Sequence, residues 1–334
     1  MISPAIALVD LPKSIGREID ILITCASYES RCLSIPRELA ASVSGSSLVV
    51  VHENLAAQIA AHRETLVSLL RGTPVLAAVD STDPIKTADA LALAFSEIFA
   101  RQSKSNRTVF VDITTFTHET LLILLRTLQS HLTGGDKTLL GYAGAADYDP
   151  GHDDASKWLS VGVEDMRSVL GFSGRILPSR KSHLVVLVGF EHERAAALIE
   201  SFEPNRLSLG YGKPGTFTGP KHEAANRRFH HLLSSMVAKS ASVESFEFAC
   251  NDPWAARDAV LERGNRYPDC NVIVAPMNTK VSTVGCALAA FKNDGIQLCY
   301  AQPASYNYSN YSSPGPHCYC WDLSADLCSV IGVT

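Results

Sequence analysis

The order of short apolar runs and longer amphipathic stretches limits the possible folds of this chain most strongly. In the first half, the apolar runs alternate with stretches that have helical periodicity. The runs have no strict alternation of apolar and polar residues, which indicates strands that are covered on both faces. A mostly parallel sheet with helices above and below it satisfies this pattern. The chain is therefore predicted to be an α/β protein.

The expected elements of the first half follow directly from this pattern. Strands are expected at residues 19–26, 47–53, 74–80, 108–114 and 138–145. Helices are expected at residues 55–70, at residues 86–102 and directly after the fourth strand.

The second half repeats the same series. The segment HLVVLVGFEHERAAALI aligns without a gap to DILITCASYESRCLSIP, and this alignment pairs Arg31 with Arg194. Three later segments match in the same order, and the last of them pairs Tyr142 with Tyr300. Similar segments in a conserved order indicate an internal duplication.

The duplication predicts two tandem Rossmann-like units with mostly parallel, five- to six-stranded sheets, related by pseudo-two-fold symmetry. The first unit is expected at residues 1–165 and the second at 183–334. Residues 166–182 contain glycines, a proline and a basic cluster, so they are expected to form a connector.

Composition excludes several classes of protein. The 334 residues carry a formal net charge of -5, so a basic face for polymeric nucleic acid is not expected. No apolar run reaches the roughly 20 residues that cross a bilayer, so no membrane association is expected. The nine cysteines are scattered, which favours a reducing cytoplasm over a disulfide framework.

Polar side chains gather where the expected strands end. In open parallel sheets, ligands bind beyond the carboxyl ends of the strands, and helix N-termini there favour anions. A nucleotide-like small molecule is the expected ligand. The predicted ligand-binding residues are Tyr28, Arg31, Thr114, Thr115, Thr117, Tyr148, Glu191, Arg194, Asn278, Thr279, Lys280 and Tyr306.

Each of these residues also has a structural interpretation. The threonines and Asn278 are residue types that cap helices. Arg194 follows Glu191 by three residues, which fits a local helical ion pair. Arg31 has no such partner upstream, so its structural interpretation is simple solvent exposure. Both interpretations stay open for each residue.

The turn that follows the fourth strand of each half resembles that of a known family. In VAPMNTKVSTVGCALAAF, a hydroxyl-containing turn ends in Lys280 and leads into an apolar helix. This layout resembles CRISPR-associated Rossmann-fold (CARF) domains and the related SAVED sensors, which join two such units. Asn278, Thr279 and Lys280 fall where that family has a Thr-Gly-Gly-Thr-Lys-type turn. The glycine pair is missing here, and in the first half Thr117, followed by His118, stands where Lys280 does.

The resemblance implies a function for the protein. Such domains pair about a two-fold axis and hold cyclic oligonucleotides, and some of them cleave the ring. The chain is therefore expected to be a sensing or regulatory subunit in bacterial antiviral defence, which binds a nucleotide or cyclic oligonucleotide in the cleft between its two Rossmann-like units. Both units use up the chain and leave no effector domain, so a protein partner or self-assembly is expected. No cofactor is expected.

Two alternatives remain beside the sensor. The chain can be a nucleotide-processing enzyme, a phosphodiesterase or ring nuclease, with His118 as the catalytic base and Lys280 near the phosphate. It can also be a scaffold of degenerate Rossmann units with a Tyr-rich interaction loop at residues 300–311. Two further segments are expected to bind no metal: the acidic loop at 148–158, and residues 314–321, which are expected to include a late strand.

Overall fold

Parallel strand pairing organises both parts of the computed structural model, which describes residues 5–102, 104–149, 158–216, 220–237 and 242–328. The chain divides into two compact units. Unit 1 consists of Met1–Asp147 together with Ser312–Thr334, and unit 2 consists of Tyr148–Tyr311. The predicted α/β class and the two Rossmann-like units with mostly parallel sheets are confirmed.

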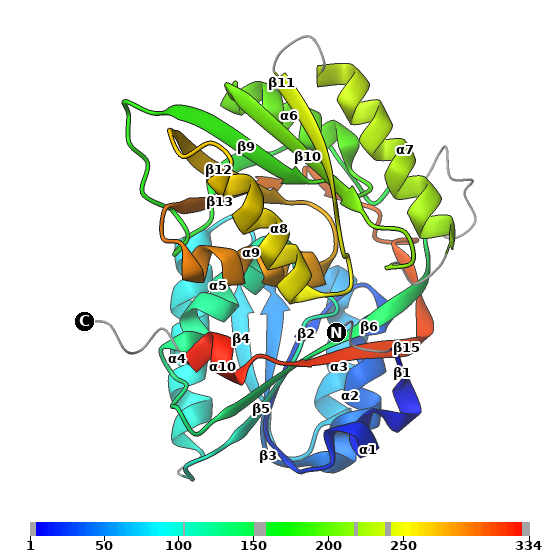
Figure 1. Cartoon of the computed structure of the whole chain (residues 1–334). Coiled ribbons are helices and arrows are strands. Elements are labelled where there is room, and N and C mark those ends of the chain that lie inside the picture. The colour runs from blue at the N-terminus through cyan, green and yellow to red at the C-terminus, as the bar shows by residue number, and fades with distance from the viewer. Residues whose placement is uncertain (1–4, 103, 150–157, 217–219, 238–241, 329–334) are drawn as a thin grey trace. The chain divides into compact units, whose positions relative to one another are not determined.

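The strands of unit 1 are β1 (Ile6–Ala7), β2 (Ile19–Ala26), β3 (Val43–His52), β4 (Val75–Val79), β5 (Thr108–Asp112), β6 (Lys137–Tyr148) and β15 (Ser312–Asp322). They form a seven-stranded sheet in the order β1-β15-β6-β5-β2-β3-β4 (Figure 1). The five strands from β2 to β6 pair in parallel, and β1 pairs antiparallel with β15. The Leu323 amide bonds to the Thr138 carbonyl and the Asp147 amide bonds to the Ser313 hydroxyl, so β15 also runs antiparallel to β6.

Unit 2 has a six-stranded sheet and a separate short ribbon. The sheet strands are β8 (Asp165–Ser168), β9 (Lys181–Leu187), β10 (Arg206–Gly212), β11 (Ser242–Phe248), β12 (Cys270–Pro276) and β13 (Ile296–Gln302). Their order is β11-β10-β9-β12-β13-β8, with only β8 antiparallel to its neighbour. The ribbon pairs β7 (Ser160–Val161) with β14 (Ser305–Tyr306).

The two sheets share one strand order. Numbered from the first parallel strand of each unit, both follow the order third, second, first, fourth, fifth, and an antiparallel sixth strand lies beside the fifth. The sixth strand is β15 in unit 1 and β8 in unit 2. Unit 1 adds β1 outside β15.

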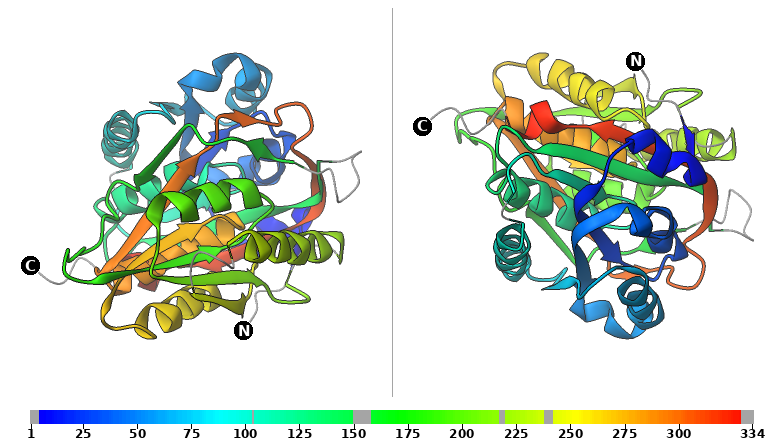
Figure 2. Two further views of the ribbon diagram at one scale, coloured as in Figure 1. Left: turned by 90° about the horizontal axis from the view of Figure 1, so that it is seen from above. Right: turned by 90° about the horizontal axis from the view of Figure 1, so that it is seen from below.

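Helices cover both faces of the sheets (Figure 2). Unit 1 contains α1 (Leu11–Ile15), α2 (Ser34–Leu39), α3 (Ala56–Leu69), α4 (Pro84–Ala100), α5 (His118–Gln129), α10 (Ser324–Cys328) and the 3-10 turns η1 (Leu8–Asp10), η2 (Ser30–Leu33), η3 (Ala40–Ser42) and η4 (Glu53–Leu55). Unit 2 contains α6 (His192–Phe202), α7 (Pro220–Val237), α8 (Pro253–Asn265) and α9 (Lys280–Lys292). In unit 1 α4 packs against α5, and in unit 2 the equivalent helices α8 and α9 pack together.

The cores explain why the strands read as continuous apolar runs. All eight residues of β2 and all seven residues of β12 are buried. In unit 2, Leu198 of α6 and Leu233 of α7 pack in one cluster with β9, β10 and β12. Strands covered on both faces have no solvent side, and therefore no alternating pattern.

The unit boundaries differ from those expected from the sequence. The expected connector at 166–182 contains most of β8 and the first residues of β9, so it is part of the unit 2 sheet. The late strand expected within residues 314–321 is present as part of β15, but it belongs to unit 1.

Candidate functional site

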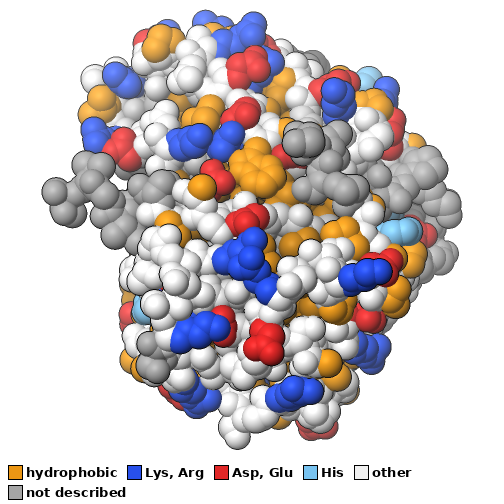
Figure 3. All heavy atoms as spheres, turned by 60° about the horizontal axis from the view of Figure 1, so that its bottom comes forward, with side chains coloured by type: hydrophobic (Ala, Val, Ile, Leu, Met, Phe, Trp, Pro, Cys, Tyr) orange, Lys and Arg blue, Asp and Glu red, His pale blue; other side chains and the backbone are white. Residues whose placement is uncertain are grey.

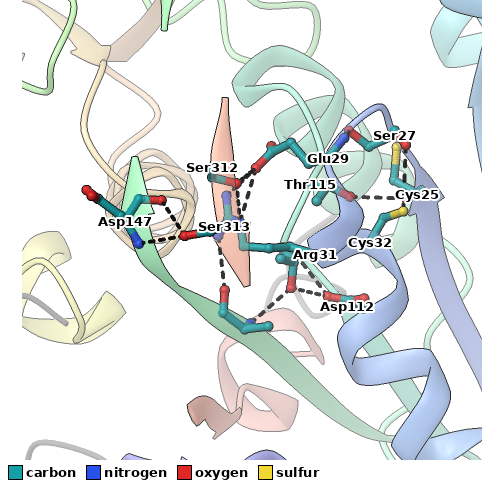
Figure 4. Close-up of polar contacts among 12 residues, drawn as sticks. Cys25, Ser27, Glu29, Arg31, Cys32, Asp112, Thr115, Asp147, Ser312 and Ser313 are labelled. Carbon is teal, nitrogen blue, oxygen red and sulfur yellow. Dashed lines mark hydrogen bonds and ion pairs between the residues drawn. The ribbon is translucent and has the colours of Figure 1, made fainter. Parts of the chain in front are cut away.

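A buried arginine lies beyond the carboxyl end of β2 in unit 1. Only 2% of the Arg31 surface is exposed. Its Nε donates to Ser312 Oγ at 2.8 Å, and its Nη2 lies 2.6 Å from Glu29 Oε2 (Figure 4). The Ser312 hydroxyl donates to the same Glu29 oxygen, and the guanidinium lies over the Tyr142 ring. We call Glu29, Arg31, Tyr142 and Ser312 the Arg31 cluster.

The Arg31 cluster corrects the interpretation made from the sequence. Arg31 is neither solvent-exposed nor without an acidic partner, because Glu29 reaches it from two residues upstream. Its Nη1 also donates to the Ala143 carbonyl at 3.1 Å. These contacts occupy Nε, Nη1 and Nη2 within unit 1, so the side chain has a structural role here.

The same arrangement recurs in unit 2. Arg194 is 4% exposed, and its Nη1 lies 2.9 Å from Glu191 Oε2 and donates to Ser160 Oγ at 2.8 Å. The Ser160 hydroxyl in turn donates to Glu191, and the guanidinium lies over the Tyr300 ring. We call Ser160, Glu191, Arg194 and Tyr300 the Arg194 cluster. The predicted local ion pair between Glu191 and Arg194 is confirmed.

The hydroxyl groups of the fourth-strand turn in unit 1 serve internal hydrogen bonds. The Thr114 hydroxyl donates to Asp112 and accepts from the Ala143 amide at 3.0 Å. The Thr115 hydroxyl donates to the Cys25 carbonyl at 3.1 Å. Thr117 caps α5, because its hydroxyl accepts the Thr120 amide at 3.1 Å. The capping and turn interpretation therefore accounts for these three threonines.

The turn of unit 2 is built in the same way. The Asn278 side chain donates to the Val188 carbonyl at 2.6 Å. The Thr279 hydroxyl donates to the Cys250 carbonyl at 2.7 Å and caps α9 by accepting the Ser282 amide. Since Thr117 and Thr279 both occupy the N-cap, the next residues, His118 and Lys280, are equivalent. The sequence alignment, which placed Thr117 against Lys280, was one residue out of register.

The predicted tyrosines have separate surroundings. Tyr28 is half-buried. The Tyr148 ring packs on Phe190 with 5.3 Å between the ring centroids. The Tyr306 hydroxyl lies 3.2 Å from the Tyr300 hydroxyl, and burial raises the pKa of Tyr306 well above its usual range. Most of the predicted acidic loop, residues 150–157, lies outside the described residues.

Unit 2 contains a cavity beside the Arg194 cluster. It measures about 230 Å³ and lies between the end of β9, the start of α6 and the segment around β7. Its lining combines aromatic and charged side chains: Trp158, Phe190, Glu191, His192, Glu193, Arg194 and Phe229. The His192 ring stacks on Phe229 at 5.1 Å, and burial lowers the pKa of His192. Of the predicted ligand residues, only Glu191 and Arg194 line this cavity.

Several residues at these strand ends were not among the site residues predicted from the sequence. Ser160 and Ser312 are distant in sequence from the arginines that they contact, and a lone serine carries no signal. Asp112 is 1% exposed and accepts hydrogen bonds from both Thr114 and Thr24. Burial raises the pKa of Asp112 to about 6 although these hydrogen bonds oppose the shift.

Because of the buried His52 at the end of β3, the folded protein is expected to lose stability in acid. Neither ring nitrogen has a hydrogen-bond partner among the described residues, and burial lowers the His52 pKa to about 4 from 6.5 in the unfolded chain. The unfolded state therefore binds the proton first, so stability is complete above pH 6.5 and falls as the pH drops towards 4. The full loss is about 3 kcal/mol. His52→Leu is expected to reduce this loss in urea titrations between pH 4 and 7, whereas exposed His317→Ala is expected to keep it.

Surface charge is mixed on the face that Figure 3 shows, where basic and acidic side chains are interspersed. Within the described ranges, no group of three or more His, Cys, Asp or Glu side chains is placed to hold a metal ion. The same residues include no helix with the length and apolar character needed to cross a bilayer.

Comparison with known proteins gives no family. No family model matches the chain. No curated protein matches it either. Three solved structures have a distant similarity to it.

The first is an S-adenosylmethionine-dependent methyltransferase from Clostridium acetobutylicum ATCC 824, at 9% identity and a TM-score of 0.23, with 48% of this chain and 56% of that chain covered. The match thus spans little more than half the length of the methyltransferase. Functionally unknown protein PA1789 from Pseudomonas aeruginosa PAO1 has 10% identity and a TM-score of 0.24 over 88% and 95% of the chains. Haemonchus contortus phosphoethanolamine N-methyltransferase 1 has 8% identity and a TM-score of 0.27 over 80% and 71%. At these scores, none of the three supports a conclusion about function.

Proposed function

We propose that the protein binds a nucleoside- or nucleotide-like small molecule in the cavity of unit 2. The observation that supports this proposal is the lining of the cavity, where Trp158, Phe190 and Phe229 surround a space that also borders Glu191 and Glu193. Aromatic side chains stack on planar bases, and carboxylates accept hydrogen bonds from sugar hydroxyls and exocyclic amines. The cavity also lies at the carboxyl end of a parallel sheet, where such folds bind ligands.

The size of the cavity limits the ligand group that it can take. Its volume of about 230 Å³ is below the roughly 300–1,000 Å³ of typical small-molecule pockets. We therefore assign to it a single base or one nucleoside, rather than a complete cyclic oligonucleotide. The rest of a larger ligand would lie outside this cavity.

The charges around the cavity favour the base or sugar of the ligand over its phosphate. Arg194 is already paired with Glu191, which leaves Glu193 as an additional acidic group on the lining. A phosphate placed here would meet net negative charge, and like charges repel each other strongly when they are shielded from water. The earlier expectation of anion capture by Arg194 is therefore replaced by recognition of a neutral ring.

A sensor or regulatory subunit is the role that we infer for such a protein, and a part in antiviral defence belongs to the same proposal. Its support is the resemblance of the fourth-strand turns, which begin helices at His118 and Lys280, to those of CARF and SAVED domains. A sensor binds its ligand and leaves it intact. An enzyme would consume the ligand.

Calorimetry of the purified full chain tests the binding proposal. The ligands are the four common nucleosides, their 5′-monophosphates and a set of cyclic dinucleotides. At least one nucleoside or nucleotide is expected to bind, and Trp158→Ala is expected to weaken its Kd about 10- to 100-fold because it removes one stacking surface. Mass spectrometry of the same samples reports whether the ligand is cleaved.

The matched control uses two glutamates on α6. Glu193 lines the cavity, whereas Glu200 lies on the same helix outside it. Glu193→Gln is expected to change affinity and Glu200→Gln to leave it unchanged. The proposal fails if no member of the panel binds, or if the cavity variants bind as well as the natural protein does.

A further inference from the structure

The two buried arginine clusters contain the same four residue types in the same pattern of contacts, although the glutamate precedes the arginine by two residues in unit 1 and by three in unit 2. In each, an arginine donates to a serine hydroxyl, that hydroxyl donates to a glutamate, and the glutamate pairs with the arginine. In each, the guanidinium also lies 5.9 Å from the centroid of a tyrosine ring on the fifth parallel strand. These tyrosines, Tyr142 and Tyr300, are the pair that the sequence alignment matched. Agreement of four residue types and their contacts supports a common origin of the two units.

The serines break the sequence order that the other three residues follow. Ser160 comes after the parallel strands of unit 1, yet it contacts Arg194 of unit 2. Ser312 comes after the parallel strands of unit 2, yet it contacts Arg31 of unit 1. Each cluster is thus completed by the segment that follows the fifth strand of the other unit.

The sixth strands follow the same exchange. The chain leaves β6 and next forms β7 and β8, but β8 pairs with β13, the fifth strand of unit 2. It leaves β13 and next forms β14 and β15, but β15 lies beside β6, the fifth strand of unit 1. Consecutive strands usually lie next to each other, so this arrangement requires contacts that hold each segment in the unit it enters.

Two segments cross between the units: the one that follows β6 and the one that leads into β15. These crossing segments are hydrogen-bonded to each other. The Asp147 amide bonds to the Ser313 hydroxyl, and the Asp149 amide bonds to the Tyr311 carbonyl. The Asp149 side chain, which is fully buried, accepts a hydrogen bond from Asn307 at 3.0 Å. The outgoing and returning chains are therefore adjacent, and β7 pairs with β14 beside them.

We propose that the protein is a duplicated six-stranded unit whose copies have exchanged their sixth strands, and that the Arg31 and Arg194 clusters hold the exchanged segments in place. Ser312 is the first residue of β15, and Ser160 is the first residue of β7. The buried Arg–Glu pair of each cluster supplies a charged acceptor and a charged donor to that serine. Hydrogen bonds to charged groups are the stronger kind, so each pair fixes one segment where it enters the unit. This inference does not depend on the ligand proposed for unit 2.

Hydrogen exchange measured by mass spectrometry on the full chain tests this role. Ser312→Ala is expected to speed amide exchange about 10-fold in β15 and leave β7 and β8 unchanged, because it removes the bonds of one segment only. Ser160→Ala is expected to speed exchange in β7 and β8 and leave β15 unchanged. Ser312→Thr, which retains the hydroxyl, is expected to restore slow exchange in β15.

Two exposed serines provide matched controls, Ser96→Ala on α4 in unit 1 and Ser235→Ala on α7 in unit 2. Neither is expected to alter exchange in β15, β7 or β8. Exchange in β2 and β9 reports whether a variant has destabilised its unit as a whole. The proposal is overturned if Ser312→Ala and Ser160→Ala leave the crossing segments as protected as in the natural protein. It is also overturned if each variant accelerates exchange equally in both units.

Discussion

Replacement of Arg31 by methionine is expected to lower the free energy of unfolding by about 3–5 kcal/mol. The substitution leaves Glu29, which is 7% exposed, as an unpaired carboxylate inside unit 1. It also removes the donor to the Ser312 hydroxyl and to the Ala143 carbonyl. Removal of one partner of a buried ion pair has a large effect because the remaining charge stays out of water. Urea denaturation followed by far-ultraviolet circular dichroism measures the change.

The chain supplies a matched control for this substitution. Arg37 lies on α2, shortly after Arg31, and its side chain is exposed, so Arg37→Met is expected to change stability by less than about 0.5 kcal/mol. The double variant Glu29→Leu with Arg31→Met is expected to recover part of the loss, because it leaves no unpaired buried charge. An Arg31→Met variant as stable as the natural protein would show that the cluster has no structural role.

Asp112→Asn is expected to raise the free energy of unfolding at pH 7.5, by at most about 3 kcal/mol. Burial holds the pKa of Asp112 at about 6 in the folded protein, against 3.8 in the unfolded chain. The folded state thus retains the proton over a pH range in which the unfolded state has lost it. Stability from this group is highest below pH 3.8, falls as the pH rises to about 6 and then stays constant. Asparagine, which is neutral at every pH, removes this fall.

Urea titrations of both proteins from pH 4 to pH 8 measure this effect. The difference in stability between the variant and the natural protein is expected to grow between pH 4 and 6, in favour of the variant. The hydrogen bonds from Thr114 to the retained oxygen can persist, so the fold is expected to tolerate the change. Asp89→Asn, at an exposed position on α4, is the control and is expected to give no such trend. A difference that stays constant from pH 4 to 8 would contradict the argument.

The fold class was predictable because it depends on local pattern. The strands β2, β5 and β12 are fully buried, and helices such as α4 and α6 bury one apolar face. The exchange of the sixth strands was not predictable in this way. β8 has only four residues, none of them fully buried, and no local pattern identifies its partner. Proximity in sequence favours pairing with the preceding strand β6, whereas the partner of β8 is β13, which follows more than 100 residues later.

The candidate site shows the same contrast between local and distant contacts. The ion pair between Glu191 and Arg194 follows the spacing of one helical turn, so the sequence predicted it. Arg31 lies in a 3-10 turn, where Glu29 approaches from two residues upstream, and helix rules do not cover this case. Ser312 reaches Arg31 across 281 residues of sequence. The cavity of unit 2 depends on how β7, β9 and α6 pack, which a single sequence does not reveal.

The position of β15 has a consequence for biosynthesis. This strand lies between β1 and β6, inside the sheet of unit 1, but it follows all the strands of unit 2 in the sequence. Unit 2 is one contiguous stretch, Tyr148–Tyr311, and is complete in the nascent chain before β15 emerges. The sheet of unit 1 therefore lacks its strand beside β6 until residue 322 has been translated. The half that is synthesised first is in this way the half that finishes folding last.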